Sequence, residues 1–124
     1  MQGVAAYKEN AVLTAPPGRL VVLLYEGAIQ FLRKAIIALD DKDYTAKNHF
    51  IGKACDIIQE LDITLDMEKG GEIARNLRSL YQFMQRHLAQ ANVSKDPQKV
   101  QHVIDLLNDL LSGWRAAASQ DVQI

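Results

Sequence analysis

The 124-residue sequence has one cysteine, three prolines and no excess of either charge. The single cysteine, Cys55, excludes a disulfide within the chain and is typical of a reducing compartment. The 14 basic and 15 acidic side chains give a formal net charge of −1. The electrostatic attraction that draws a protein to nucleic acid or to an anionic membrane surface is therefore absent, and we expect no nucleic-acid partner.

Long apolar runs and targeting signals are also absent from the sequence. No run approaches the ~20 consecutive apolar residues that a membrane-spanning helix needs. The opening MQGVAAYKEN lacks the basic and apolar regions of a signal peptide. We expect a cytoplasmic protein that does not insert into membranes.

Motifs for catalysis or metal binding are sparse. The three histidines, His49, His87 and His102, lack the Glu-x-x-His spacing of di-metal helical bundles, and no two are spaced to share a helix face. The Lys-Gly-Gly at 69–71 lacks the spacing of a phosphate-binding loop. Cys55 has no histidine near it in sequence, which favours a structural thiol over a nucleophile. We therefore expect no enzyme, no cofactor and no metal site.

What the sequence does contain is apolar residues at spacings of three and four almost from end to end, the pattern of amphipathic helices. Short polar or Gly/Pro breaks interrupt this pattern at 14–18, 40–43, 69–71 and 92–97. Short connections make successive helices antiparallel. The fold class that we predict is therefore all-α, an antiparallel up-down-up-down four-helix bundle, with helices at about 17–39, 43–67, 71–91 and 96–119.

The predicted domain organisation has a mobile N-terminal tail over 1–15, the bundle over 16–119 and a C-terminal tail over 120–124. Asp43 and Asp96 are the expected N-caps of the second and fourth helices, because an aspartate can accept a hydrogen bond from the first turn. Gly70 is expected to adopt the left-handed conformation that closes a helix. The core stripe of the third helix is expected to begin at Ile73.

The first predicted helix is more apolar than a bundle position requires. Its apolar arc is about 220° wide on a helical projection, whereas a helix with two neighbours needs roughly half of its circumference. Two explanations, which are compatible, remain open at this stage. Either the tail covers the surplus apolar surface of this helix, or that surface forms part of a groove for another chain, as large apolar patches often do.

These patterns give a set of candidate partner-binding residues. Three lie in the tail, four lie on the flank of the first helix outside its predicted core face, and three are outlying apolar residues of the second and third helices. In this order they are Tyr7, Val12 and Leu13; Val22, Tyr25, Ile29 and Ile36; and Ile63, Met67 and Phe83.

Three stretches, in the same order along the chain, resemble the FliS family of flagellin export chaperones. They are YKENAVLTAPPGRLVVLLYEGAIQFLRKA at 7–35, KACDIIQELDITLDMEKGGEIARNLRSLYQFMQRHLAQAN at 53–92, and LLNDLLSGW at 106–114. Each stretch alone is mostly helix patterning, whereas the colinear set is far more specific and covers nearly the whole chain.

The resemblance implies a cytoplasmic chaperone rather than an enzyme. Such a chaperone binds the disordered C-terminal segment of flagellin, prevents premature polymerisation and assists delivery to the flagellar type III export apparatus. Export-gate components and flagellar regulators are further candidate partners. The alternative is a structural homo-oligomeric bundle, or an adaptor for another amphipathic helix, in which the apolar surplus has a different occupant.

Overall fold

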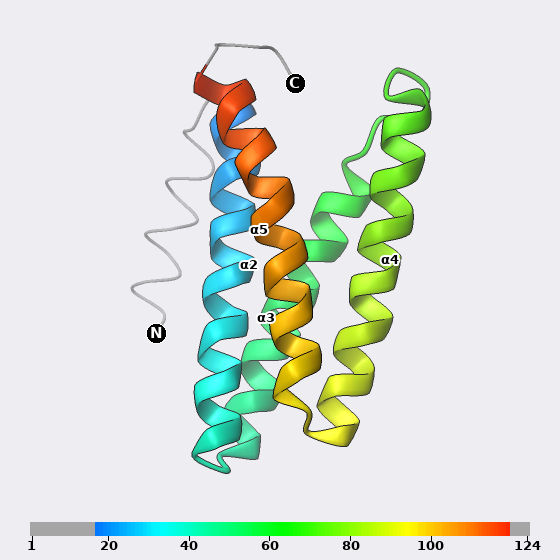
Figure 1. Cartoon of the computed structure of the whole chain (residues 1–124). Coiled ribbons are helices and arrows are strands. Elements are labelled where there is room, and N and C mark those ends of the chain that lie inside the picture. The colour runs from blue at the N-terminus through cyan, green and yellow to red at the C-terminus, as the bar shows by residue number, and fades with distance from the viewer. Residues whose placement is uncertain (1–16, 120–124) are drawn as a thin grey trace.

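The computed structural model describes residues 17–119, which form four α-helices and contain no strand. Successive helices run in opposite directions, and α2 and α4 each lie beside both α3 and α5 (Figure 1). The predicted all-α, antiparallel up-down-up-down bundle is therefore confirmed. The predicted tails at 1–15 and 120–124 lie outside the described residues. The helices are α2 (Pro17–Asp40), α3 (Tyr44–Ile63), α4 (Gly71–Ser94) and α5 (Pro97–Ser119).

Helix α3 ends at Ile63, four residues before the predicted end at Met67. The cause is Asp66, whose Oδ1 accepts hydrogen bonds from the backbone N–H groups of Glu68 and Lys69 at 3.1 and 2.9 Å. An aspartate that bonds to nearby backbone in this way offers the chain a turn in place of another helical turn. Met67 therefore lies in the connection between α3 and α4 and not on a helix face.

The two predicted aspartate caps are confirmed. Asp43 Oδ1 accepts from the N–H of Ala46 at 3.1 Å, and Asp96 Oδ1 accepts from the N–H of Gln98 at 2.9 Å. Helix α4 continues to Ser94, three residues beyond its predicted end, and closes at Lys95 in the left-handed conformation. The α4–α5 connection is therefore shorter than the sequence break suggested.

The two glycines before α4 have roles that the sequence did not separate. Gly71 has a φ of +54°, whereas Gly70, predicted to be left-handed, has an ordinary helical φ of −76°. Gly70 is needed for a different reason. A Cβ at this position would lie 2.7 Å from the carbonyl oxygen of Asp66 and 2.6 Å from the Cβ of Ala74. One glycine supplies the turn and the other allows a close backbone approach.

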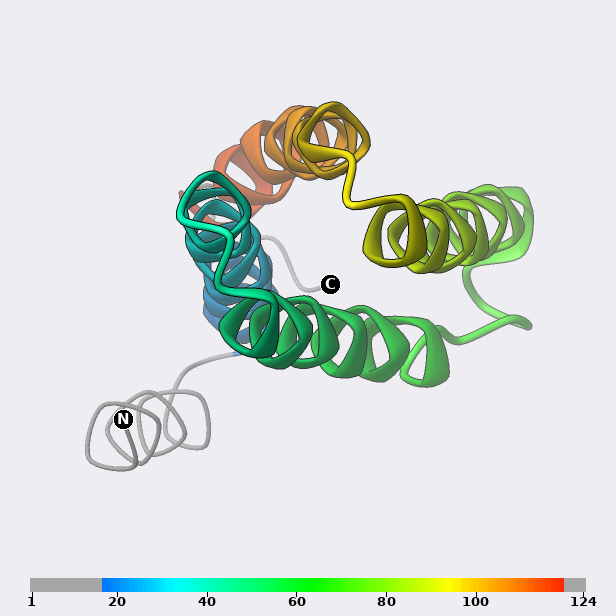
Figure 2. The same ribbon diagram turned by 90° about the horizontal axis from the view of Figure 1, so that it is seen from below.

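Helix α2 supplies much of the apolar core, because α3 and α5 flank it on two sides (Figure 2). Its fully buried side chains recur at helical spacing and face the residues that α3, α4 and α5 contribute to the same cluster. Those of α2 with no exposed area are Val22, Tyr25, Ala28, Leu32 and Ala35.

Tyr25 and Tyr81 join the two helices that lie diagonally across the bundle. Their hydroxyl oxygens are 2.6 Å apart and share a hydrogen bond in the buried interior. The Tyr25 ring also meets Trp114 of α5 at 6.2 Å between ring centroids. Burial raises the pKa of both tyrosines, so both hydroxyls remain protonated at neutral pH. Three helices therefore meet at Tyr25.

Polar side chains hold α4 against α3 along the length of their contact. Each satisfies a hydrogen-bonding group of the other helix, which fixes the register of the pair. The bonds run from Arg78 Nε to Asp62 Oδ1 at 3.0 Å, from Gln85 Nε2 to the carbonyl of Cys55 at 2.9 Å, and from Lys47 Nζ to the carbonyl of Asn92 at 3.0 Å.

The Tyr25–Tyr81 bond predicts a coupled pair of mutations. Tyr25→Phe and Tyr81→Phe should each lower the free energy of unfolding by about 1–3 kcal/mol, because each leaves a buried hydroxyl without this partner. The double variant should cost clearly less than the sum of the two. Urea denaturation of the four proteins measures the coupling, and strict additivity would contradict the assigned bond.

The surroundings of the glycines predict that a Gly→Ala substitution lowers the free energy of unfolding at two positions and raises it at a third. Gly71→Ala should destabilise the chain by about 1–2 kcal/mol through left-handed strain. Gly70→Ala should cost about 2 kcal/mol through the clash with Asp66. Gly52→Ala, in open space on α3, is the matched control and should stabilise by about 0.5–1 kcal/mol. Equal effects at the three positions, measured by thermal unfolding, would refute this assignment of roles.

Candidate partner-binding surface

Three of the four residues predicted to form a flank of α2 lie in the core. Val22 and Tyr25 have no exposed area and Ile29 is 3% exposed. The expectation that they lie on a flank outside the core face is therefore wrong, because all three belong to the buried core cluster. The projection assumed contacts from two neighbouring helices, but Tyr25 is also covered from the diagonal helix α4. Ile36 is half-buried and packs against the core cluster.

The predicted residues of α3, α4 and their connection are more accessible. Ile63 is 62% exposed at the end of α3, and Met67 is half-buried in the connection that follows. Phe83 is half-buried on α4, where its ring stacks on that of His87. Tyr7, Val12 and Leu13 lie outside the described residues. The structure therefore leaves the predicted candidates on separate parts of the bundle.

Other exposed apolar side chains were missed as candidates. Ile37 is 60% exposed and Ile73, expected in the core, is 72% exposed. The core stripe of α4 starts at Ala74, which is 3% exposed, so Ile73 faces away from it. The signal for Ile37 was present in the sequence, because this isoleucine falls on the polar side of its helix. The residues on that side are Arg19, Glu26, Gln30, Arg33 and Lys34.

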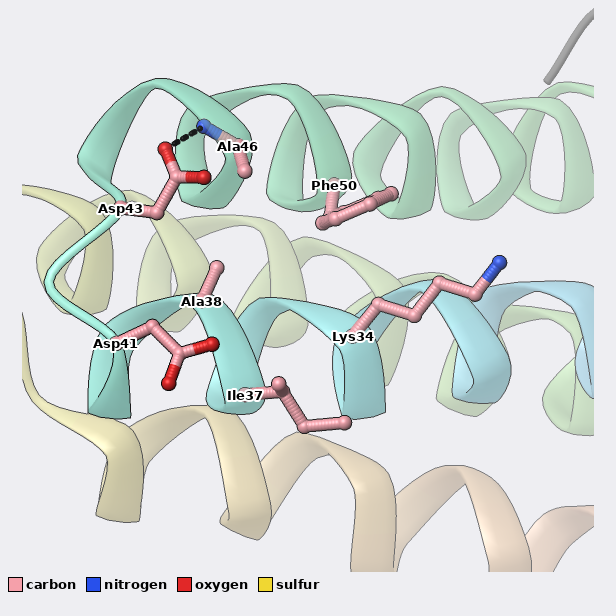
Figure 3. A pocket seen from close by; sticks show the side chains of 7 residues that line it. All are labelled: Lys34, Ile37, Ala38, Asp41, Asp43, Ala46 and Phe50. Carbon is pink, nitrogen blue, oxygen red and sulfur yellow. Dashed lines mark hydrogen bonds between the residues drawn. The ribbon is translucent and has the colours of Figure 1, made fainter.

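A hollow lies beside the turn that joins α2 and α3 (Figure 3). Its volume is about 190 Å³, below the roughly 300 Å³ of a typical cofactor pocket. A space of this size is suited to one inserted side chain. Its lining combines apolar and charged residues from both helices and the turn: Lys34, Ile37, Ala38, Asp41, Asp43, Ala46 and Phe50.

An aromatic pair forms one side of this region. The rings of Phe31 and Phe50 stack with centroids 6.3 Å apart. The ammonium of Lys34 lies 6.0 Å from the Phe31 centroid and 5.8 Å from the Phe50 centroid. This is a cation–π arrangement, which orients the charged head of Lys34 at the edge of the hollow. The region can therefore offer both an apolar contact and a positive charge.

The described residues offer little for catalysis. Burial raises the pKa of the Cys55 thiol to about 11, and the charge of Asp56 adds to this. The thiol is therefore protonated at neutral pH, which is not the state of a nucleophile. Over residues 17–119, no group of three or more His, Cys, Asp or Glu side chains is placed to hold a metal ion. None of the described helices has the length and apolar character of a membrane span.

Two histidines that are far apart in sequence lie side by side. His87 Nε2 of α4 and His102 Nδ1 of α5 are 3.3 Å apart. Burial lowers the pKa of His87, and the nearby His102 and Lys99 lower it further, whereas Asp96 opposes them. The sequence could not pair these residues, because their contact depends on the register of two different helices.

Comparison with known proteins connects these features to a family. The family described as flagellar protein FliS matches residues 1–121. The flagellar secretion chaperone FliS of Salmonella typhimurium is 41% identical over 118 residues, covering 91% of this chain and 87% of its own. The protein of the same name from Bacillus subtilis is 35% identical over 116 residues, covering 94% and 86%. A chaperone of this kind is a binding protein and not an enzyme.

A solved structure agrees in fold. A crystal structure described as a flagellar chaperone from bacteria aligns with a TM-score of 0.78 and 22% identity, covering 97% of this chain and 98% of the other. The resemblance found in the sequence is thus confirmed along nearly its whole length. The chain belongs to the FliS family of flagellar proteins.

Proposed function

We propose that this protein is a cytoplasmic flagellar secretion chaperone that binds the C-terminal segment of flagellin. It keeps the segment from polymerising prematurely and assists its delivery to the flagellar type III export apparatus. The observation that carries the proposal is the family match over residues 1–121, together with relatives named as flagellar secretion chaperones.

The exposed apolar residues support a binding function. Ile37, Ile63 and Ile73 remain 60–72% exposed on a bundle whose interior is already filled by other apolar side chains. Exposed positions of this kind suit an amphipathic client helix, which places its own apolar residues at spacings of three and four. A disordered client must also become ordered on binding. About 200 Å² of apolar burial offsets an ordering cost of about 5 kcal/mol.

The hollow between α2 and α3 provides a place for one anchoring side chain of the client. Ile37 and Phe50 supply apolar contacts there, and Lys34 can pair with a client carboxylate. Buried apolar anchors surrounded by a polar rim contribute most of the affinity in many protein interfaces. We assign this hollow to the client surface.

The predicted residues divide into two groups in this proposal. Ile36, Ile63, Met67 and Phe83 contribute contacts, as do three residues of the segment 1–15, which are Tyr7, Val12 and Leu13. Val22, Tyr25 and Ile29 act from inside, by fixing α2 in the bundle, because a client reaches them only if the helices separate. Export-gate components and flagellar regulators remain candidate partners of the loaded chaperone.

Removal of the last few dozen residues of flagellin tests the client assignment. Full-length flagellin co-expressed with this chain should be retained in a pull-down at a one-to-one ratio, and the truncated flagellin should be lost. Sedimentation of the chain alone at micromolar concentration is the companion measurement. Equal retention of both flagellins, or a stable homodimer that does not bind flagellin, would contradict the proposal.

Substitution of exposed apolar residues tests the surface. Ile63→Asp and Ile37→Asp should each weaken binding of a flagellin C-terminal peptide by about tenfold, because each removes an apolar contact and adds a charge that must be desolvated. Calorimetric titration measures the affinity. Unfolding should change little, since both side chains are mostly exposed.

Gln59→Asp is the matched control for Ile63→Asp. It adds the same carboxylate at an exposed position one turn earlier on α3 and should leave the affinity unchanged. The surface is wrongly placed if both isoleucine variants bind as the unmodified chain does. It is also wrongly placed if the Gln59 control loses as much affinity as they do.

A further inference from the structure

The histidine pair on α4 and α5 has the geometry of two ligands of one metal ion. His87 Nε2 and His102 Nδ1 are 3.3 Å apart. Imidazole nitrogens bind Zn²⁺ at 2.0–2.1 Å, and two such ligands of a tetrahedral ion lie roughly 3.3–3.4 Å from each other. The separation that permits a hydrogen bond is therefore also the separation that a shared ion requires.

The helical register creates this pair and holds it in place. The α4–α5 connection brings Lys99 Nζ within 3.2 Å of Gln90 Oε1, and the same pairing of positions sets His102 opposite His87. Phe83 stacks on the His87 ring with centroids 5.0 Å apart and meets the His102 ring edge-on at 5.9 Å. These contacts restrict rotation of the rings and keep the two nitrogens close together.

The surroundings permit an ion to enter but do not enclose it. His102 is exposed and His87 is half-buried, so solvent reaches the pair. Among residues 17–119, no third His, Cys, Asp or Glu completes a cluster, so water would fill the remaining coordination positions. The nearby charges of Lys99 and Asp96 have opposite signs and offset each other. Such a site is exchangeable, unlike a closed structural zinc centre with four protein ligands.

We propose that His87 and His102 form a two-histidine site for a borderline transition-metal cation such as Zn²⁺, Ni²⁺ or Cu²⁺. The ion replaces the hydrogen bond between the rings and links α4 to α5. Neutral imidazole suits these metals, whereas Mg²⁺ prefers oxygen ligands. Because an ion that binds only the folded state stabilises it by mass action, the bound metal raises the melting temperature. The site adjoins Phe83, one of the residues assigned above to the client surface, but its test uses the chain alone and does not involve flagellin.

Titration of the untagged full-length chain with ZnCl₂ tests the site. Calorimetry should give one Zn²⁺ per chain, and MgCl₂ should give no binding. His87→Gln and His102→Gln should each weaken Zn²⁺ affinity on the order of tenfold, because one imidazole is left alone. His49→Gln, which removes the remaining histidine on α3, is the matched control and should bind as the unmodified chain does.

A spectroscopic readout keeps the test independent of the variants' folding. In imidazole NMR spectra of the unmodified chain, Zn²⁺ should shift the ring signals of His87 and His102 and leave those of His49 in place. Equal Zn²⁺ affinity in the His87, His102 and His49 variants would overturn the proposal. So would ring signals of His87 and His102 that do not move while Zn²⁺ is in excess.

Discussion

The structure depends on burying one unusually apolar helix. Helix α2 is flanked by α3 and α5, and its Tyr25 reaches Tyr81 of α4 across the bundle at 2.6 Å. Apolar burial stabilises roughly in proportion to area, so the wide arc of α2 favours an arrangement in which every other helix contributes to its cover. The buried hydroxyl pair then fixes how the diagonal helix is turned, because an unpaired buried hydroxyl is costly.

The sequence predicts the fold well because its signals are local. Apolar spacing, aspartate caps and short breaks identify the four helices, and Asp43 and Asp96 cap as expected. The errors arise where a side chain competes with the helix or where helices meet. Asp66 ends α3 early by bonding to the following turn. Gly71 takes the left-handed conformation assigned to Gly70, since φ at neighbouring glycines depends on how the turn closes.

The candidate surface was harder to predict than the fold. A helical projection separates apolar from polar faces, but it does not count the helices that cover the apolar face. The projection therefore places Val22, Tyr25 and Ile29 on a flank although they are buried, and it does not select the exposed Ile37 as a binding residue. The His87–His102 contact could not be predicted, because it depends on the register of α4 against α5.

In the proposed complex, the closed bundle binds flagellin through its exposed apolar positions, and the α2 core stays intact. Amide hydrogen exchange of this chain, with and without a saturating flagellin C-terminal peptide, tests it most directly. We expect slower exchange around Ile37–Phe50 and Ile63–Ile73 on binding, with no faster exchange over Val22–Ile29. Unchanged exchange in the first two regions, or faster exchange over Val22–Ile29, would contradict it.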